Sequence, residues 1–178
     1  SGIIIIGTGS ASTYDSMTDV PTLTSTTAAN YATFNPLNSA NNGTLGGANL
    51  NIDSNSGSAS AQTTAGTMSM KSGKYYFEYT RVQLSNGMYF GIIRDDIFIS
   101  GGNVGLSVGE YGYFVEGSGT LYVNGSTTAS WITAFAQGNT AMVAYDADTG
   151  KVWLGRNGVW GGSGDPAAGT NPAATVNS

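Results

Sequence analysis

The sequence predicts an all-β protein, an antiparallel β-sandwich with an extended arm at its N-terminus. Short runs alternate apolar and polar side chains with a period of two, and Asn-Gly or other glycine-containing turns separate most of them. No window sustains the period of an amphipathic helix, so we expect little helix. Many short strands with a turn roughly every 8 to 12 residues are typical of two sheets packed face to face.

The arm and its connector are residues 1–35, and the sandwich is residues 36–178. Asn35-Pro36 marks the expected boundary, because this dipeptide favours a turn. The arm opens with four β-branched residues between glycines, which need burial on both faces: Ile3, Ile4, Ile5 and Ile6. We expect this run either to pack on its own domain or to insert into a partner, since an exposed strand of this composition would aggregate.

The strongest expected strand is residues 73–84. Because side chains alternate along a strand, Tyr75, Phe77 and Tyr79 share one face and Tyr76 points to the other. The sequence therefore predicts one continuous strand with an aromatic face and a second, mixed face.

A hairpin is expected after this strand. Asn86-Gly87 tolerates positive φ and predicts that residues 88–93 return beside residues 73–84. The other expected strands are residues 44–52, 59–70, 103–106, 110–115, 120–123, 131–135, 140–146 and 151–156, with a weaker signal at residues 174–176.

The charge balance excludes some functions. Charged residues make up 10 % of the chain, the formal net charge is −5, and there are 6 Lys and Arg residues. Nucleic-acid binding needs a basic stripe, so we expect no nucleic-acid partner. No run approaches the roughly 20 apolar residues of a membrane span, so we expect no membrane insertion. The chain has no cysteine and therefore no disulfide, which does not by itself assign a compartment.

Three blocks resemble a SPRY domain, a concanavalin-like β-sandwich (jelly roll) that serves as an interaction module. Residues 73–79, Gly-Lys-Tyr-Tyr-Phe-Glu-Tyr, resemble its opening strand. Tyr111-Gly-Tyr-Phe, together with Leu121-Tyr-Val-Asn-Gly125, resembles its central segment. Residues 140–160, a strand ending in Asp, a turn, and an aromatic strand into Asn-Gly, resemble its hallmark. The resemblance implies a rigid scaffold whose loops at one end contact a partner, and it does not imply catalysis.

The variant resembled most is the SPRY module of bacteriophage tail and fibre proteins. In those modules a similar Asn-Gly-Val-Trp segment, here Asn157–Trp160, is followed by an Asp-Pro-rich loop. The segments that precede the module in those phage proteins are similar to Asp15-Ser16 and to residues 31–37. In that family one or two further strands would follow the loop, whereas this sequence stops at Ser178. The resemblance therefore implies either a longer protein or a neighbouring chain that supplies a strand to an open sheet edge.

Acidic residues offer few candidates for chemistry. Asp146-x-Asp148-x-Gly150 begins like a calcium loop but lacks the later ligands, so we expect a hairpin turn. Asp95-Asp96, with the nearby Glu110, could bind a cation or polarise a sugar, and a solvated loop pair is the default reading. Glu110 and Glu116 could form a glycosidase pair only with suitable separation and one raised pKa. With no His and no Cys, His-dependent triads and soft-metal sites are excluded.

Aromatic residues are the better candidates for a contact site. Trp131, Trp160 and Tyr111 could form a platform on which a sugar ring stacks, with Asn and Ser side chains bonding its hydroxyl groups. The alternative is that alternating aromatic residues fill the core, where each buries about 150–250 Å². We favour the core for Trp153 and Tyr113, and leave both readings open for Trp131 and Trp160, which flank loops.

The sequence therefore favours a non-enzymatic structural or adhesion subunit of a bacteriophage virion: a fibre, an appendage or a capsid-decorating protein. Its expected partners are other virion proteins or copies of itself, with a bacterial surface glycan or receptor on the outward loops. We expect no catalytic residue, cofactor or metal site, and a location in the virion, extracellular when mature. The alternative is a carbohydrate-binding module of a larger secreted protein, and a glycan depolymerase is a third reading.

Overall fold

The computed structural model describes residues 32–40, 44–47, 49–53, 63–82, 88–94 and 112–176. The contact pattern divides the chain into Ser1–Ala32 and Thr33–Ser178, and the description below concerns the second unit. Several sequence predictions lie outside the described residues: Ile3, Ile4, Ile5, Ile6, Asp95, Asp96, Glu110, Tyr111 and the expected strand at residues 103–106.

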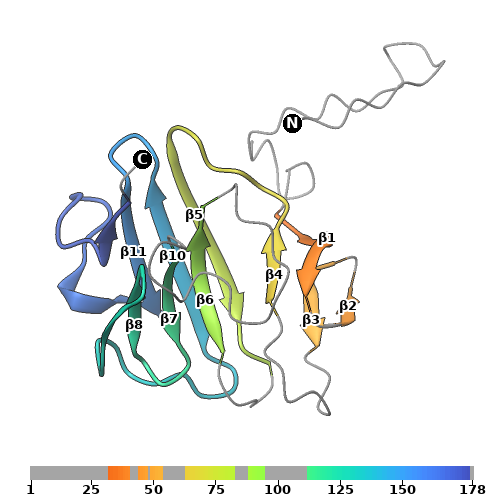
Figure 1. Cartoon of the computed structure of the whole chain (residues 1–178). Helices are drawn as coiled ribbons and strands as arrows, with labels where there is room; N and C mark the ends of the chain where they lie inside the picture. The colour runs from red at the N-terminus through yellow and green to blue at the C-terminus, as the bar shows by residue number, and fades with distance from the viewer. Residues whose placement is uncertain are drawn as a thin grey trace, which may run out of the picture. The chain divides into compact units, whose positions relative to one another are not determined.

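The fold is all-β and antiparallel, as the sequence predicts (Figure 1). One sheet has the order β12-β11-β10-β5, with β13 also paired to β11, and a second has the order β6-β7-β8-β9. The strands of the first sheet are β5 (Lys74–Thr80), β10 (Thr140–Asp146), β11 (Lys151–Arg156), β12 (Val159–Trp160) and β13 (Ala174–Thr175). Those of the second are β6 (Tyr89–Ile93), β7 (Gly112–Glu116), β8 (Leu121–Val123) and β9 (Ser126–Thr128).

Two smaller sheets lie in the earlier part of the unit. They are made of β1 (Phe34–Ala40) with β4 (Thr63–Gly66), and of β2 (Thr44–Gly46) with β3 (Asn51–Asp53). The helical element of the described residues is a short 3₁₀ turn, η2 (Gly161–Ser163). No helix in the described part of the chain is long and apolar enough to cross a membrane.

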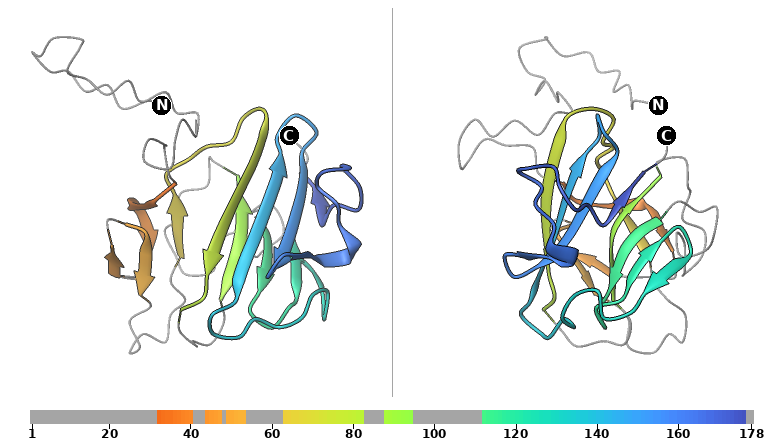
Figure 2. Two further views of the ribbon diagram at one scale, coloured as in Figure 1. Left: turned by 180° about the vertical axis from the view of Figure 1, so that it is seen from behind. Right: turned by 90° about the vertical axis from the view of Figure 1, so that its left-hand side faces the viewer.

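The core lies between the two larger sheets, which form two layers in the side view (Figure 2). Its buried members come from β6, β7 and β8 on one side, from β10 and β11 on the other, and from one loop residue: Phe90, Ile92, Tyr113, Val115, Leu121, Phe135, Ala141, Val143, Val152 and Leu154. Val115, Val152 and Leu154 are fully buried, and burying a side chain of this size contributes roughly 1.5–3 kcal/mol.

The strand patterns follow from what covers each face. In β5 Tyr75, Phe77 and Tyr79 share one face, as the sequence predicts; this face is half-buried and the other is exposed. In contrast, β10 and β11 are buried on both faces, because the chain after β12 folds back over the outer face of β11. Strands buried on both faces have near-continuous apolar sequences rather than alternating ones.

The predicted hairpin between residues 73–84 and 88–93 is wrong. β5 pairs with β10, from Thr80↔Thr140 to Lys74↔Asp146, whereas β6 pairs with β7. The chain therefore changes sheets between β5 and β6. Asn-Gly predicts only a local reversal, and the pairing partner is decided by which strand offers a matching buried face.

The predicted strand at residues 131–135 is also wrong. This segment has no strand pairing and instead runs beside the turn that joins β7 to β8. The Ile132 N–H donates to the Gly119 carbonyl at 3.2 Å, and the Phe135 N–H donates to the Gly117 carbonyl at 2.8 Å. Gly119 has φ +89 and a Cβ there would lie 2.0 Å from the Ile132 oxygen, so the close approach requires glycine.

The early strands differ from their predictions in extent. Residues 44–52 form two short strands rather than one, because Gly47 and Asn49 have positive φ and turn the chain. The expected strand at residues 59–70 is described as a strand only at Thr63–Gly66. Asn35 and Pro36, the expected boundary, lie inside β1, at an irregular stretch of its pairing where a proline is tolerated.

The later turns agree with the sequence. Asn124-Gly125 joins β8 to β9 and Asn157-Gly158 joins β11 to β12, with positive φ at all four residues. This is the conformation that Asn-Gly favours in two-residue hairpins. After the Asp-Pro-rich loop, β13 returns to β11 through Thr175↔Lys151 and Ala174↔Val152.

Candidate functional site

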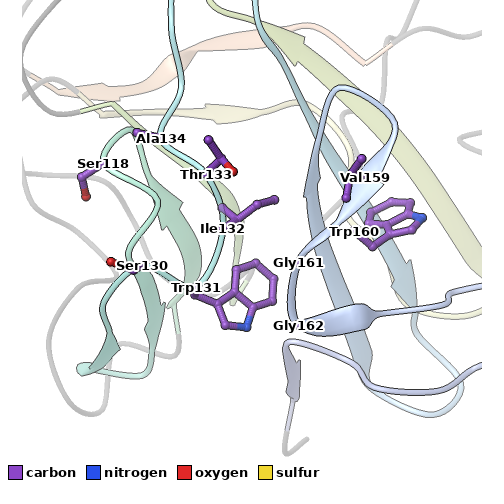
Figure 3. Close-up of a pocket in the computed structure, with 10 residues that line it drawn as sticks. All are labelled: Ser118, Ser130, Trp131, Ile132, Thr133, Ala134, Val159, Trp160, Gly161 and Gly162. Atoms are coloured by element: carbon purple, nitrogen blue, oxygen red, sulfur yellow. The ribbon is translucent and has the colours of Figure 1, made fainter.

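Trp131 and Trp160, the two described residues of the expected platform, line one hollow (Figure 3). Its volume is about 600 Å³, which is within the usual range of small-molecule sites. The hollow lies between the segment after β9 and the segment formed by β12 and η2. Its described lining residues are Ser118, Ser130, Trp131, Ile132, Thr133, Ala134, Val159, Trp160, Gly161 and Gly162.

Trp131 is held against a glycine backbone. A Cβ at Gly161 would lie 2.2 Å from Cζ3 of Trp131, and a Cβ at Gly162 would lie 3.0 Å from its Nε1. The indole therefore packs directly on the Gly161-Gly162 main chain, as Figure 3 shows, and also contacts the core. The ring is half-buried, so it is both positioned by packing and open to the hollow.

Trp160 is placed by the Asn157-Gly158 hairpin. It pairs with Gly155 of β11, where a Cβ would lie 2.9 Å from Cε3 of the indole. Its ring meets that of Tyr76 edge to face, with centroids 6.2 Å apart. Trp160 is half-buried and its side chain lies on the far side of the β12 backbone from Trp131 (Figure 3).

The backbone around the hollow is locally strained. Ser130 has φ +53 and Ser163 has φ +57, and one residue precedes Trp131 while the other follows Gly162. Residues other than glycine in this left-handed region cost of order 1 kcal/mol, and they occur often at ligand-binding sites. The strain is consistent with loops that are held in place around a contact surface.

The chemistry of the hollow is aromatic and neutral. None of its ten described lining residues has a titratable side chain. Ser130 and Thr133 offer hydroxyl groups that can donate and accept, whereas the Ser118 hydroxyl already donates to the Glu116 carboxylate at 2.7 Å. The arrangement suits ring stacking combined with neutral hydrogen bonds.

A second hollow, which the sequence analysis missed, adjoins the first across Trp160. Its volume is about 410 Å³, and its lining residues are Lys74, Tyr75, Tyr76, Ala144, Tyr145, Asp146, Trp153, Trp160, Asp165, Pro166 and Ala167. It lies on the outer face of the first sheet. The signal available in the sequence was Tyr76, a large aromatic residue on the face of β5 opposite the core, where it is 54 % exposed.

The other aromatic predictions agree with burial. Tyr113 is buried in the core at 5 % exposure, and Trp153 is buried at 2 % on the outer face of β11. The Trp153 Nε1–H donates to the Thr170 carbonyl at 2.8 Å, so the loop after η2 covers its ring.

Asp146-x-Asp148-x-Gly150 is a hairpin turn, as expected. The Asp146 carboxylate accepts from the N–H groups of Asp148 and Thr149 at 3.1 and 3.3 Å, and Gly150 has φ +69. Slight desolvation raises the pKa of Asp146, but the hydrogen bonds from Thr149 and Asp148, together with Lys74, lower it by more. Its pKa is therefore below the ordinary value of 3.8.

Glu116 is tied into a small surface network. It accepts from the Ser118 hydroxyl at 2.7 Å and from the Tyr89 hydroxyl at 3.4 Å. Within the described ranges, no three or more His, Cys, Asp or Glu residues gather as a metal site would require.

Comparisons with known proteins show a similarity to solved structures. No protein-family model matches the chain, and a search of curated proteins finds no match. The crystal structure of the SPRY domain of human HERC1 aligns at 20 % sequence identity with a TM-score of 0.43. The alignment covers 53 % of this chain and 60 % of that one, less than two thirds of its length. The antiparallel sandwich itself follows from the strand pairing and the shared core.

Proposed function

We propose that this chain is a non-catalytic contact subunit of a bacteriophage particle, a fibre, an appendage or a capsid-decorating protein, that binds a bacterial surface glycan. The hollow beside Trp131 carries the proposal. It combines the half-buried ring of Trp131 with hydroxyl side chains, and none of its described lining residues is titratable.

A glycan suits this lining for a physical reason. The flat, apolar face of a pyranose packs on an aromatic ring, and its hydroxyl groups exchange hydrogen bonds with Ser and Thr. Trp131 is already fixed by the Gly161-Gly162 backbone, so little side-chain entropy is lost on binding. With 10 % charged residues in the chain, recognition would depend on stacking and neutral hydrogen bonds rather than on salt bridges.

The virion setting is supported by the sequence. The segment from Asn157 into the Asp-Pro-rich loop resembles the SPRY modules of phage tail and fibre proteins, and the isoleucines at residues 3–6 would anchor the chain. The proposed partners are other virion proteins or copies of this chain, and the mature location is the extracellular virion. Low charge and abundant hydroxyl groups suit a subunit that stays fixed in an assembly.

A second candidate is a carbohydrate-binding module of a larger secreted protein. The same hollow favours it, because a glycan site is common to both proposals. The two differ in assembly: a virion subunit forms stable oligomers or binds particles through its arm, whereas a module acts as a monomer.

The glycan site is tested with the full chain on a glycan array, beside Trp131→Ala. We expect the wild type to bind a subset of neutral glycans and Trp131→Ala to lose that binding. Trp131 also contacts the core, so Trp131→Ala could lose binding through a change in the fold. Thr133 is exposed, and Thr133→Val is therefore a second variant that is expected to fold normally. Binding that is unchanged in both variants would show that the hollow is not the site.

Assembly is tested by light scattering of the full chain and of a variant without residues 1–10. A stable oligomer that falls apart on deletion supports the virion subunit. A monomer in both cases, with glycan affinity retained, would favour the secreted module instead.

A further inference from the structure

The outer face of the first sheet carries a groove that the proposed function does not use. We call it the outer groove and define it by the lining of the second hollow, of about 410 Å³. Its floor is Ala144 of β10, and Tyr76 and Trp160 flank it with rings at 76° to each other. The loop residues Asp165 and Pro166 line it as well.

The groove offers no backbone hydrogen bonds to a ligand at its floor. Ala144 pairs with Tyr76 of β5 on one side and with Trp153 of β11 on the other. Because β10 is paired along both edges, an extended peptide could not add to it as a strand. A ligand here must be held by side chains, through ring stacking and bonds to polar tips.

The charges around the groove are more negative than positive. Its described lining carries one ammonium group, Lys74, and two carboxylates, Asp146 and Asp165. The Glu78 carboxylate, which accepts from the Tyr76 hydroxyl, lies beside it. The Lys151 ammonium donates to the Gly169 carbonyl at 2.8 Å. An excess of carboxylates disfavours an anionic polymer, so a neutral ligand suits the site better than an anionic one.

Asp165 supplies an oriented acceptor. Its Oδ1 accepts from the Ala168 N–H at 3.0 Å, and its backbone pairs with Thr170 in both directions. Within the described part of the chain, this leaves the other carboxylate oxygen available to a hydroxyl group of a ligand. The Tyr76 hydroxyl donates to Glu78, and burial together with this bond raises the pKa of Tyr76 to about 12, so the ring stays neutral.

The walls are held before any ligand binds. The loop that carries Asp165 is fixed by the bond from Trp153 to Thr170 and by the bond from Lys151 to Gly169. A Cβ at Gly164 would lie 2.8 Å from Cδ1 of Trp153, so the loop lies directly on that indole. Preorganised side chains bind with a smaller entropic loss.

We propose that the outer groove is a second binding site for a neutral glycan, so that each chain holds a polymeric glycan at two places. The inference rests on the proposed function in one respect, that the protein is a glycan-contact subunit. A sugar ring would stack on Tyr76 and Trp160, and Asp165 would accept from its hydroxyl groups. Two sites on one chain raise the affinity for a polymer above that for a short sugar, through effective concentration.

The test is a titration of the full chain with dextran, maltohexaose, cellohexaose and N-acetylchitohexaose, and with oligogalacturonate as an anionic counterpart. The variants are Tyr76→Ala and Asp165→Asn for the outer groove, and Trp131→Ala for the first hollow. Asp165→Asn retains an oxygen for the Ala168 N–H, so the loop is expected to keep its turn. Leu50→Ala, which removes an exposed apolar side chain from the turn between β2 and β3, is the control.

We expect Tyr76→Ala and Trp131→Ala each to weaken binding of the best neutral ligand about tenfold, and the double variant to lose about a hundredfold. Asp165→Asn should also weaken binding of that ligand, and Leu50→Ala should leave it unchanged. Oligogalacturonate should bind at least tenfold more weakly than the neutral ligands.

The two proposals fail in different ways. If Trp131→Ala weakens binding while Tyr76→Ala and Asp165→Asn do not, the outer groove is not a glycan site and the first hollow stands. If the reverse is seen, the first hollow is wrong and the outer groove stands. A Tyr76→Ala variant that loses self-association instead of glycan affinity would show that a second copy occupies the groove. A wild type that binds none of the neutral probes contradicts both proposals.

Discussion

The ring of Trp160 meets the ring of Tyr76 edge to face, with centroids 6.2 Å apart and planes at 76°. The two residues come from β12 and β5, at opposite ends of the strand order β12-β11-β10-β5. Their side chains meet over the two central strands, where Ala144 and Gly155 are small enough to leave room beneath them. Ala144 is buried although it faces away from the core, and it shares a hollow with these two rings. Met142, on the same face, is covered by the turn after β11, whose Gly158 N–H donates to its Sδ at 2.9 Å.

Removing Tyr76 should therefore cost stability although it is largely exposed. We expect Tyr76→Ala to lower the free energy of unfolding by about 1–2 kcal/mol, because the edge contact and its covered area are lost. Tyr76→Phe keeps the ring and should stay within about 0.5 kcal/mol of the wild type. Urea unfolding measures both. Equal losses in the two variants would mean that the hydroxyl bond to Glu78, rather than the ring, is what stabilises the fold.

Gly161 should not tolerate a side chain. A Cβ there would lie 2.2 Å from the Trp131 ring, so Gly161→Ala must displace the indole and should cost about 1–3 kcal/mol. The same variant should lose glycan binding at the first hollow. Gly46→Ala, at a strand position with nothing within 4 Å of the new Cβ, is the matched control. A Gly161→Ala protein as stable as this control would contradict the packing described for Trp131.

Arg81 should be important for the loop that follows β9. It is 8 % exposed, and its Nη1 donates to the Phe135 carbonyl at 2.8 Å. Arg81→Met removes a charge-assisted bond to a buried carbonyl and should cost roughly 1.5–3 kcal/mol. Lys71→Met, at an exposed lysine, should change stability by less than about 0.5 kcal/mol. Chemical unfolding measures the free energy of unfolding of both variants. Similar losses of stability in both would contradict the role assigned to Arg81.

The turn between β10 and β11 should contribute to acid sensitivity. The pKa of Asp146 is lowered below 3.8, so the folded state favours its ionised form. That contribution is present above the unfolded pKa and is lost as the pH falls through the folded value. Asp146→Asn should therefore be less stable than the wild type at pH 7, with the difference shrinking below pH 3.8. A difference that is constant from pH 7 to pH 2 would contradict this assignment.

Much of the fold could be predicted because several elements are specified locally. β10 and β11 end where the sequence predicts, since the Asp146 turn and the Asn157-Gly158 hairpin determine both ends by short-range chemistry. In β5 the side chains alternate between two faces, so the sequence shows which residues share the half-buried face. These signals need no knowledge of the partner strand.

Pairing and site assembly could not be predicted in the same way. Residues 86–87 indicate a reversal, but β5 pairs with β10, about sixty positions later in the chain, because buried faces rather than the nearest turn select partners. Residues 131–135 have strand-like composition, yet their backbone groups bond to the turn at residues 117–119. Trp131 and Trp160 could be chosen as candidates because both flank loops in the sequence. The outer groove could not be predicted, because it depends on a loop that folds back over Trp153, and the alternation of side chains along strands gives no information about that loop.

The most direct test of the glycan-contact role is the indole region of an ¹⁵N NMR spectrum of the full chain. The sequence has 3 tryptophans, so three side-chain signals are expected, assigned by Trp→Phe variants. Trp153 is buried, its N–H is bonded to Thr170 and it lines the outer groove, so its signal should shift less than that of Trp160. On addition of the best-binding neutral glycan, the Trp131 signal should shift most and the Trp160 signal should follow. A Trp131 signal that does not move while that glycan is bound would contradict the account.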